Sequence, residues 1–125
     1  MSARTQMVMV GSLLALTALA GLASAHSFPE KETPSAGETL QASPGAISIK
    51  FDAPIEHLFA QLQVVGPDGK DQAAGAPEID SDGYTMRVAV PALKPGAYTV
   101  KWAVVCIDTH HTFGSYEFNV GQGGS

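Results

Sequence analysis

Apolar and polar residues alternate along several short stretches of the chain, with an apolar side chain at every second position. This period of two is typical of a β-strand that buries one face and exposes the other. After the first 25 residues, no segment repeats its apolar residues at the spacing of a helix. Many short alternating strands separated by turns predict an all-β sandwich or barrel. The predicted strands are residues 46–51, 61–64, 85–90, 98–104 and 115–120.

Proline, glycine and small polar residues separate these strands and predict turns. Residues 26–41 contain proline and glycine without helical periodicity, which indicates an extended segment anchored to the core by Phe28 and Leu40. Residues 70–83 are polar or rich in glycine and alanine, so we expect mostly loop there. The turns are predicted at residues 43–45, 66–69 and 94–97.

Residues 1–25 have the pattern of a secretory signal peptide. Arg4 precedes a long apolar run without charge, and the run ends in Ala23-Ser24-Ala25, an A-x-A cleavage pattern. A retained membrane anchor is the alternative, but the run is short for a membrane span. We therefore expect export to the periplasm and a mature domain of residues 26–125 that begins at His26.

Composition narrows the classes of partner. The chain has a formal net charge of −5, and all of its acidic residues follow residue 25. A surface that binds nucleic acid needs a basic footprint, so we expect no nucleic acid partner. Cys106 is the single cysteine, which excludes an internal disulfide, and its place in an apolar run predicts a buried thiol. We expect a monomer stabilised by a small hydrophobic core.

Candidate metal-binding chemistry lies near the C-terminal end of the chain. Asp108 and His110 are two residues apart, so in an extended chain their side chains point to the same side and could converge on one ligand. They continue the core-facing positions of the Tyr98 strand, where unpaired polar groups would be costly. The site is therefore expected at the mouth of the sandwich, in a loop over residues 107–113. His111 points the other way and is expected on the surface.

A third ligand is offered by His26, if cleavage makes it the first residue. An N-terminal histidine carries two nitrogen donors, the α-amine and the ring Nδ1. The reference pKa of an α-amine is about 7.7–8.0, so a metal can displace its proton near neutral pH. With Asp108 and His110 the set becomes three nitrogens and one oxygen, which suits tetragonal Cu(II). Thioether ligands for Cu(I) are scarce, because Met86 is the single methionine after residue 25.

Several segments together resemble the CopC family of periplasmic copper-binding proteins. Residues 33–40, TPSAGETL, look like the family's S/T-P-x-x-G-x-x-L segment, and residues 47–56, ISIKFDAPIE, resemble a strand that enters an F-S-E-P-V-E type turn. Residues 93–102, LKPGAYTVKW, followed by Asp108-Thr109-His110, are similar to its L-x-x-G-x-Y-x-V-x-W…S-D-x-H segment. The signal peptide that ends directly before His26 adds to the resemblance.

The resemblance implies a fold, a metal site and a function. The implied fold is a Greek-key, immunoglobulin-like β-sandwich or barrel of about seven to nine short strands. The implied Cu(II) site consists of His26, Asp108 and His110. The implied function is not enzymatic: a periplasmic protein that binds Cu(II) for sequestration, copper resistance or delivery to an inner-membrane copper transporter.

The chain departs from the family pattern beside the expected site. The family often has a glutamate in the turn after the strand, and Ala53 stands at that position. Asp52, Glu56 and His57 are nearby and are candidate accessory groups. The methionine-rich segment that some members use for Cu(I) is missing, which argues against a second copper site.

Two other functions stay open at this stage. An N-terminal histidine paired with a second histidine also forms the histidine brace of copper enzymes that oxidise polysaccharides on related β-sandwich folds. The short chain and the lack of an obvious flat aromatic surface argue against such an enzyme. The other alternative is an exported β-sandwich interaction module in which these His and Asp residues bind no metal.

Overall fold

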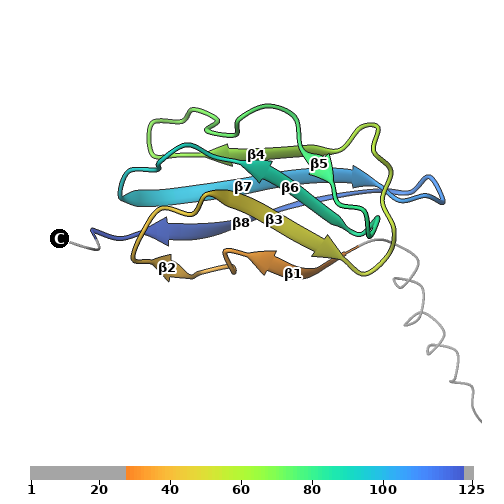
Figure 1. The fold of residues 1–125 in the computed structure, drawn as a ribbon, viewed down its shortest axis with the longest axis horizontal. Helices are drawn as coiled ribbons and strands as arrows, with labels where there is room; N and C mark the ends of the chain where they lie inside the picture. Colours follow the sequence, from red (N-terminus) through yellow and green to blue (C-terminus); the bar gives the residue numbers. More distant parts are fainter. Residues whose placement is uncertain (1–27, 123–125) are drawn as a thin grey trace, which may run out of the picture.

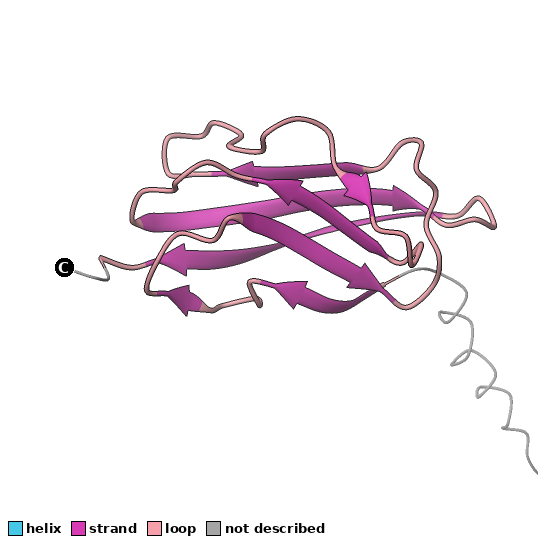
Figure 2. Cartoon of the chain, viewed as in Figure 1, coloured by secondary structure: helices cyan, strands magenta, loops and turns pink. Residues whose placement is uncertain are grey.

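The computed structural model describes residues 28–122, which form eight β-strands and no helix (Figures 1 and 2). Among these residues there is accordingly no helix that could span a membrane. The predicted signal peptide and His26 lie outside the described residues. The strands are β1 (Pro29–Thr33), β2 (Thr39–Leu40), β3 (Ala46–Phe51), β4 (Gln61–Val65), β5 (Glu78–Ile79), β6 (Thr85–Ala89), β7 (Gly96–Val105) and β8 (His111–Val120).

The strands form two four-stranded sheets, in the orders β1-β3-β6-β5 and β2-β8-β7-β4. Neighbouring strands are antiparallel except β2 and β8, which are parallel. The sheets face one another without joining into one closed barrel (Figure 1). The predicted all-β sandwich is therefore confirmed, and the barrel alternative is not.

The core lies between the sheets and consists of the alternating apolar residues. Phe51 of β3 packs edge-on against Trp102 of β7, with ring centroids 5.2 Å apart. Tyr98 of β7 stacks on Phe118 of β8 at 5.6 Å. Leu40 packs against this core as predicted. The anchoring role predicted for Phe28 is wrong, because 43% of its surface is exposed.

The largest differences from the sequence-based prediction are at the start of β8 and at β5. β8 begins at His111 rather than at residue 115, so the predicted loop over residues 107–113 is shorter. The pattern concealed this part of the strand, since polar Thr112 is the buried side chain and Phe113 is 81% exposed. β5 lies within the predicted loop of residues 70–83 because its two residues, paired with β6, are too few to show a period.

The sandwich has two ends that differ in their loops. We call one the hairpin end: it comprises the connector of residues 52–60, the turn of residues 80–84, the β7–β8 hairpin of residues 106–110, and Phe28 before β1. We call the other the far end: it comprises residues 41–45, 66–70 and 90–95. Figure 1 shows the hairpin end on the right.

Candidate metal centre

The β7–β8 hairpin carries the two predicted metal ligands of the described chain. The strands stay paired up to Val105 and His111. The turn is then closed by two backbone bonds: Cys106 N–H donates to the His110 carbonyl at 2.8 Å, and Thr109 N–H donates to the Cys106 carbonyl at 2.8 Å. Cys106 is buried, as predicted, and residues 107–110 are exposed. Val105 and Cys106 are both buried, so the strand alternation ends before Asp108.

Asp108 and His110 contact each other directly. His110 Nδ1 lies 3.0 Å from Asp108 Oδ2, and the His110 backbone N–H donates to Asp108 Oδ1 at 3.2 Å. Both side chains are about half exposed. The imidazole hydrogen bond is the main cause that holds the pKa of Asp108 below its ordinary value, followed by the backbone bond. Asp108 therefore both fixes the turn and orients the imidazole, as in many metal sites where a carboxylate holds the ligating histidine.

The N-terminal strand enters the fold at this same end of the sandwich. The Phe28 N–H donates to Asp52 Oδ1 at 2.9 Å, and the Asp52 N–H donates to the Phe28 carbonyl at 2.9 Å. The Asp52 backbone and carboxylate thus hold the chain at the start of β1 at this end of the sandwich.

The connector of residues 52–60 packs against the base of the hairpin. Ile55 forms an isolated bridge with Cys106. The Glu56 N–H donates to the Val105 carbonyl at 2.8 Å, and the Ile107 N–H donates to the Pro54 carbonyl at 3.4 Å. Backbone hydrogen bonds therefore link the start of β1 to this connector, and the connector to the hairpin, at one end of the fold.

The remaining accessory candidates lie in the same connector. Ala53 is half-buried, Glu56 is half-buried and His57 is exposed. Within residues 28–122, no three or more His, Cys, Asp and Glu side chains form a group that could hold a metal ion. The described residues thus provide the Asp108–His110 pair and would need at least one donor from outside that range.

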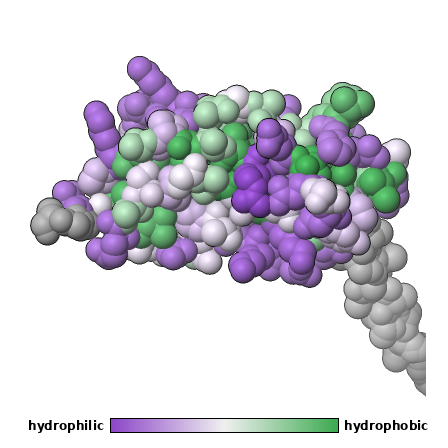
Figure 3. Space-filling view, viewed as in Figure 1, coloured by the Kyte–Doolittle hydropathy of each residue, from purple (hydrophilic) through white to green (hydrophobic). Residues whose placement is uncertain are grey.

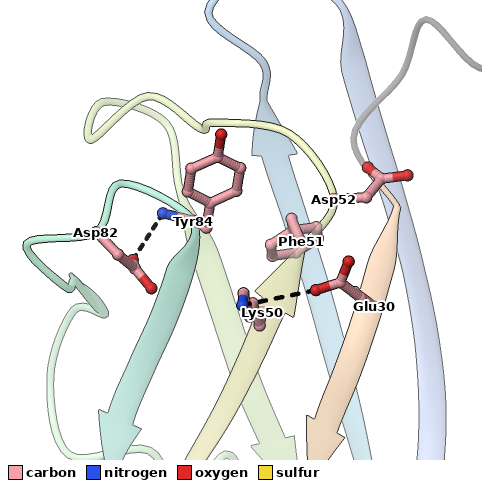
Figure 4. Close-up of a pocket in the computed structure, with 6 residues that line it drawn as sticks. All are labelled: Glu30, Lys50, Phe51, Asp52, Asp82 and Tyr84. Atoms are coloured by element: carbon pink, nitrogen blue, oxygen red, sulfur yellow. Dashed lines mark hydrogen bonds and ion pairs between the residues drawn. The ribbon is translucent and has the colours of Figure 1, made fainter.

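A second group of charged residues lies beside β3 at the same end and lines a pocket of about 370 Å³ (Figure 4). Lys50 Nζ lies 3.7 Å from Glu30 Oε1 across the sheet. Asp82 accepts hydrogen bonds from the backbone of Tyr84 at 2.8 Å and of Thr85 at 3.0 Å. The Thr85 hydroxyl donates to Asp82 Oδ2 at 2.9 Å. These bonds, above all the one from the Tyr84 backbone, lower the pKa of Asp82. The Asp82 carboxylate therefore stabilises the turn in which it lies.

Large apolar side chains are exposed around the hairpin, which the sequence-based analysis did not predict. They are 43–81% exposed, and all of them belong to the hairpin end or to the first residues of β8 beside it. Figure 3 shows apolar surface at this end of the molecule. In the sequence these residues look like core positions, because exposure is not encoded in the type of residue. They are Phe28, Leu58, Phe59, Ile107 and Phe113.

Comparison with known proteins identifies relatives of this chain. Residues 29–121 match the family model described as the CopC domain. The protein YobA of Escherichia coli K12 is 34% identical over 98 residues, which cover 77% of this chain and 79% of YobA. The copper transport protein CutJ of Bacillus subtilis is 28% identical over 112 residues, which cover 88% of this chain but 21% of CutJ.

Two solved structures share the fold. The crystal structure of CopC from Methylosinus trichosporium OB3b has a TM-score of 0.72 and 29% sequence identity, covering 77% of this chain and 94% of that one. PcoC of Escherichia coli, a methionine-rich copper resistance protein, has a TM-score of 0.67 and 24% identity, covering 76% and 98% respectively. The second likeness concerns the fold alone.

Proposed function

Because this chain belongs to the CopC family, we propose that it binds one Cu(II) ion through His26, Asp108 and His110. The observation that carries the proposal is the Asp108–His110 pair, which is half exposed on the hairpin at the end where β1 begins. The Phe28–Asp52 bonds hold the chain at that end only two residues after His26. This arrangement supports a shared site for the N-terminus and the hairpin.

The donor set of the proposed site fits Cu(II). His26 would give its α-amine and ring Nδ1, and His110 would give Nε2, the ring nitrogen that does not face Asp108. Three nitrogens with one carboxylate oxygen suit a tetragonal centre. Asp108 can take one of two parts in this site: it orients His110 through Nδ1, as the present contact does, or it leaves Nδ1 to supply the oxygen, since Nδ1 and Nε2 point to opposite sides of the ring.

The accessory residues take different parts in this proposal. Asp52 positions the start of β1 and thereby the preceding His26. Glu56 and His57 border the hairpin through the connector and are candidate contacts to the metal's outer ligands. They would take over the part of the glutamate that the family often has at the position of Ala53.

We propose that copper binding depends on export. Residues 1–25 act as a signal peptide, and its removal in the periplasm creates the amine that completes the site. The mature domain, residues 26–125, is then a monomeric, non-enzymatic copper protein. CutJ, which joins a similar segment to a much longer copper transport protein, favours delivery of Cu(II) to a membrane copper transporter over storage alone.

The test is a Cu(II) titration of the mature chain followed by electron paramagnetic resonance. We expect one Cu(II) per chain with a nitrogen-rich spectrum. An extra glycine before His26 should lower the affinity at least tenfold, since it moves the amine out of the chelate, and His110→Ala should do the same. His111→Ala, which changes the neighbouring histidine at the start of β8, is the matched control and should bind as the unaltered chain does.

Two results would contradict the proposal. Unchanged affinity after the added glycine would remove His26 from the site. If the unaltered chain bound copper no more strongly than the His110→Ala variant, an exported interaction module would be the better description. Release of oxidised sugars from polysaccharide with copper and a reductant would instead support the histidine-brace enzyme.

A further inference from the structure

Exposed apolar side chains are concentrated at one end of the described molecule. Phe28, Leu58, Phe59, Ile107 and Phe113 are the large hydrophobic residues exposed within residues 28–122, and each lies at or beside the hairpin end. At the far end the comparable side chains are buried, as Leu93 and Tyr98 show. A concentration of exposed apolar side chains at one end of a molecule is typical of a site of interaction.

Two of these rings border a shallow pocket on the outer face of the β4–β7–β8 sheet. The strand register places Phe113 opposite Ala103, and Ala103 opposite Gln61 of β4. Phe59, just before β4, and Phe113 both line this pocket of about 260 Å³, whose floor includes the small Ala103. Exposed aromatic side chains beside such a pocket are typical anchor residues of a protein interface.

The pocket lies next to the turn that carries the proposed metal ligands. Val105 and His111 line it, and they form the last strand pair before the turn that carries Asp108 and His110. A partner in this pocket would therefore lie next to the copper donors. The hydrogen bond from the Glu56 N–H to the Val105 carbonyl joins the connector that carries Phe59 to the end of β7.

Backbone conformation supports a specialised role for Phe59. Phe59 and Thr109 are the two non-glycine residues with positive φ in the described chain, at 67° and 75°. A bulky aromatic residue rarely takes this left-handed conformation, and such strain is retained where a side chain must be presented in a particular direction. Here it presents a ring that is 72% exposed beside the pocket.

The charges at this end indicate the chemistry of the partner. Residues 52–60 and 106–113 contain the acids Asp52, Glu56 and Asp108 but no lysine or arginine. An anionic lipid surface would attract basic residues next to the apolar anchors, and these loops lack them. A second copy of this chain, with its net charge of −5, is also a poor electrostatic match. The complementary occupant is a protein surface with an apolar centre and a basic rim.

We propose that the hairpin end docks on the copper transport protein invoked above, with Phe59 and Phe113 as the anchors and the copper donors facing the interface. This inference rests on the proposed function, since it assigns that function's partner to a surface. In CutJ a segment similar to this chain is part of a much longer copper transport protein, so covalent linkage keeps two such parts near each other in one relative.

The test is site-specific photo-crosslinking of the full chain in the bacterium that produces it. A benzophenone amino acid replaces Phe59 or Phe113 in separate variants, and Ala92, exposed in a far-end loop, is the matched control position. We expect both hairpin-end probes to form an adduct with a protein that mass spectrometry identifies as a copper transport protein. The Ala92 probe should give less than about a tenth of that yield, as expected for a position outside an interface core.

A second variant separates the anchors from the metal. With the probe at Leu58, the double substitution Phe59→Ser and Phe113→Ser should lower the adduct yield about tenfold or more, as loss of hot-spot aromatic contacts does. Its Cu(II) titration should match that of the unaltered chain, because neither ring is a metal donor.

Several outcomes would overturn the docking proposal: adducts with a second copy of this chain, adducts with lipid, equal yields from all three positions, or no adduct. The copper titration, measured on the same preparations, tells the two proposals apart. Normal copper binding without an adduct rejects the docking surface alone. Adducts with the transport protein from a chain that binds no copper reject the proposed function and retain the surface.

Discussion

At the far end of the sandwich, Tyr98 is only 3% exposed and donates its hydroxyl to the Lys94 carbonyl at 2.6 Å. At the hairpin end, Phe113 leaves 81% of its surface in solvent. Both are aromatic residues near the ends of long strands of the same sheet. The buried ring of Tyr98 contributes to stability. The exposed ring of Phe113 lacks most of the roughly 25 cal/mol that is gained per Å² of buried apolar surface.

The backbones at the two ends differ in the same way. At the far end, segments of the chain pack so closely that two glycine positions have no room for a side chain. A Cβ on Gly96 would lie 2.7 Å from Pro67, and one on Gly66 would lie 2.9 Å from Tyr98. The hairpin end carries left-handed, non-glycine Phe59 and Thr109. One end is packed for rigidity, and the other keeps strained, exposed groups, which is the pattern expected where binding takes place.

The largest effect is expected from Tyr98→Ala. Removing a buried ring that stacks on Phe118 should lower the free energy of unfolding by about 3–5 kcal/mol, measured by urea denaturation. Tyr98→Phe is the matched control and should cost about 1 kcal/mol, because it removes only the hydroxyl bond to Lys94. An equally small loss for both variants would show that this end is not packed as described.

Gly96→Ala should have the next largest effect on stability. Gly96 has φ +150° and a neighbour at 2.7 Å from the Cβ position, so the new methyl group forces Pro67 or the strand to move. We expect a loss of about 1–3 kcal/mol in the same denaturation experiment. Gly45→Ala lies at the same end with nothing within 4 Å of its Cβ position and should be nearly neutral. Equal effects of the two substitutions would contradict the close packing of the far end.

Acid should weaken the hairpin end through Asp82. Folding lowers the pKa of this carboxyl. Its contribution to the free energy of unfolding is therefore fully present above the ordinary pKa of about 3.9 and is lost as the pH falls through the lower pKa of the folded state. In Asp82→Asn that group no longer titrates. The urea midpoint of the variant should therefore fall less steeply than that of the unaltered chain between about pH 5 and pH 3. If the urea midpoints of the two proteins fell in parallel, Asp82 would not be the cause of the loss of stability at low pH.

The smallest effect on stability is expected from Phe113→Ala. A side chain this exposed contributes little to folding, so the free energy of unfolding should change by no more than about 0.5 kcal/mol. Thermal and urea denaturation measure this directly. A loss comparable to that of Tyr98→Ala would mean that Phe113 is part of the core, and the contrast between the two ends would not hold.

Much of the fold could be predicted from alternation alone. The residues predicted for β3 match the strand, and those for β4, β6 and β7 differ from the structure by one or two residues at an end. These segments bury one face, so each residue's surroundings follow from its neighbours two positions away. The start of β8 could not be found in this way, because Thr112 is buried and Phe113 is exposed.

The candidate site divides in the same manner. Asp108 and His110 could be identified from their spacing, and the predicted cleavage directly before His26 supplied the third ligand, which the family resemblance then also implied. The direct contact between Asp108 Oδ2 and His110 Nδ1 could not be predicted from that spacing, because it forms in the turn at Thr109. That contact depends on how the chain reverses direction, which strand periodicity does not describe.

The sequence by itself determined the strand pattern, the family and the residue types that could bind copper. Only the tertiary structure decided that the start of β1, the connector and the hairpin meet at one end, through bonds such as Phe28–Asp52 and Glu56–Val105. It also decided that apolar side chains around that hairpin stay exposed. The physical reason is that alternation reports the local face of a strand, whereas contacts between loops and exposure at the end of a sandwich depend on segments far apart in the chain.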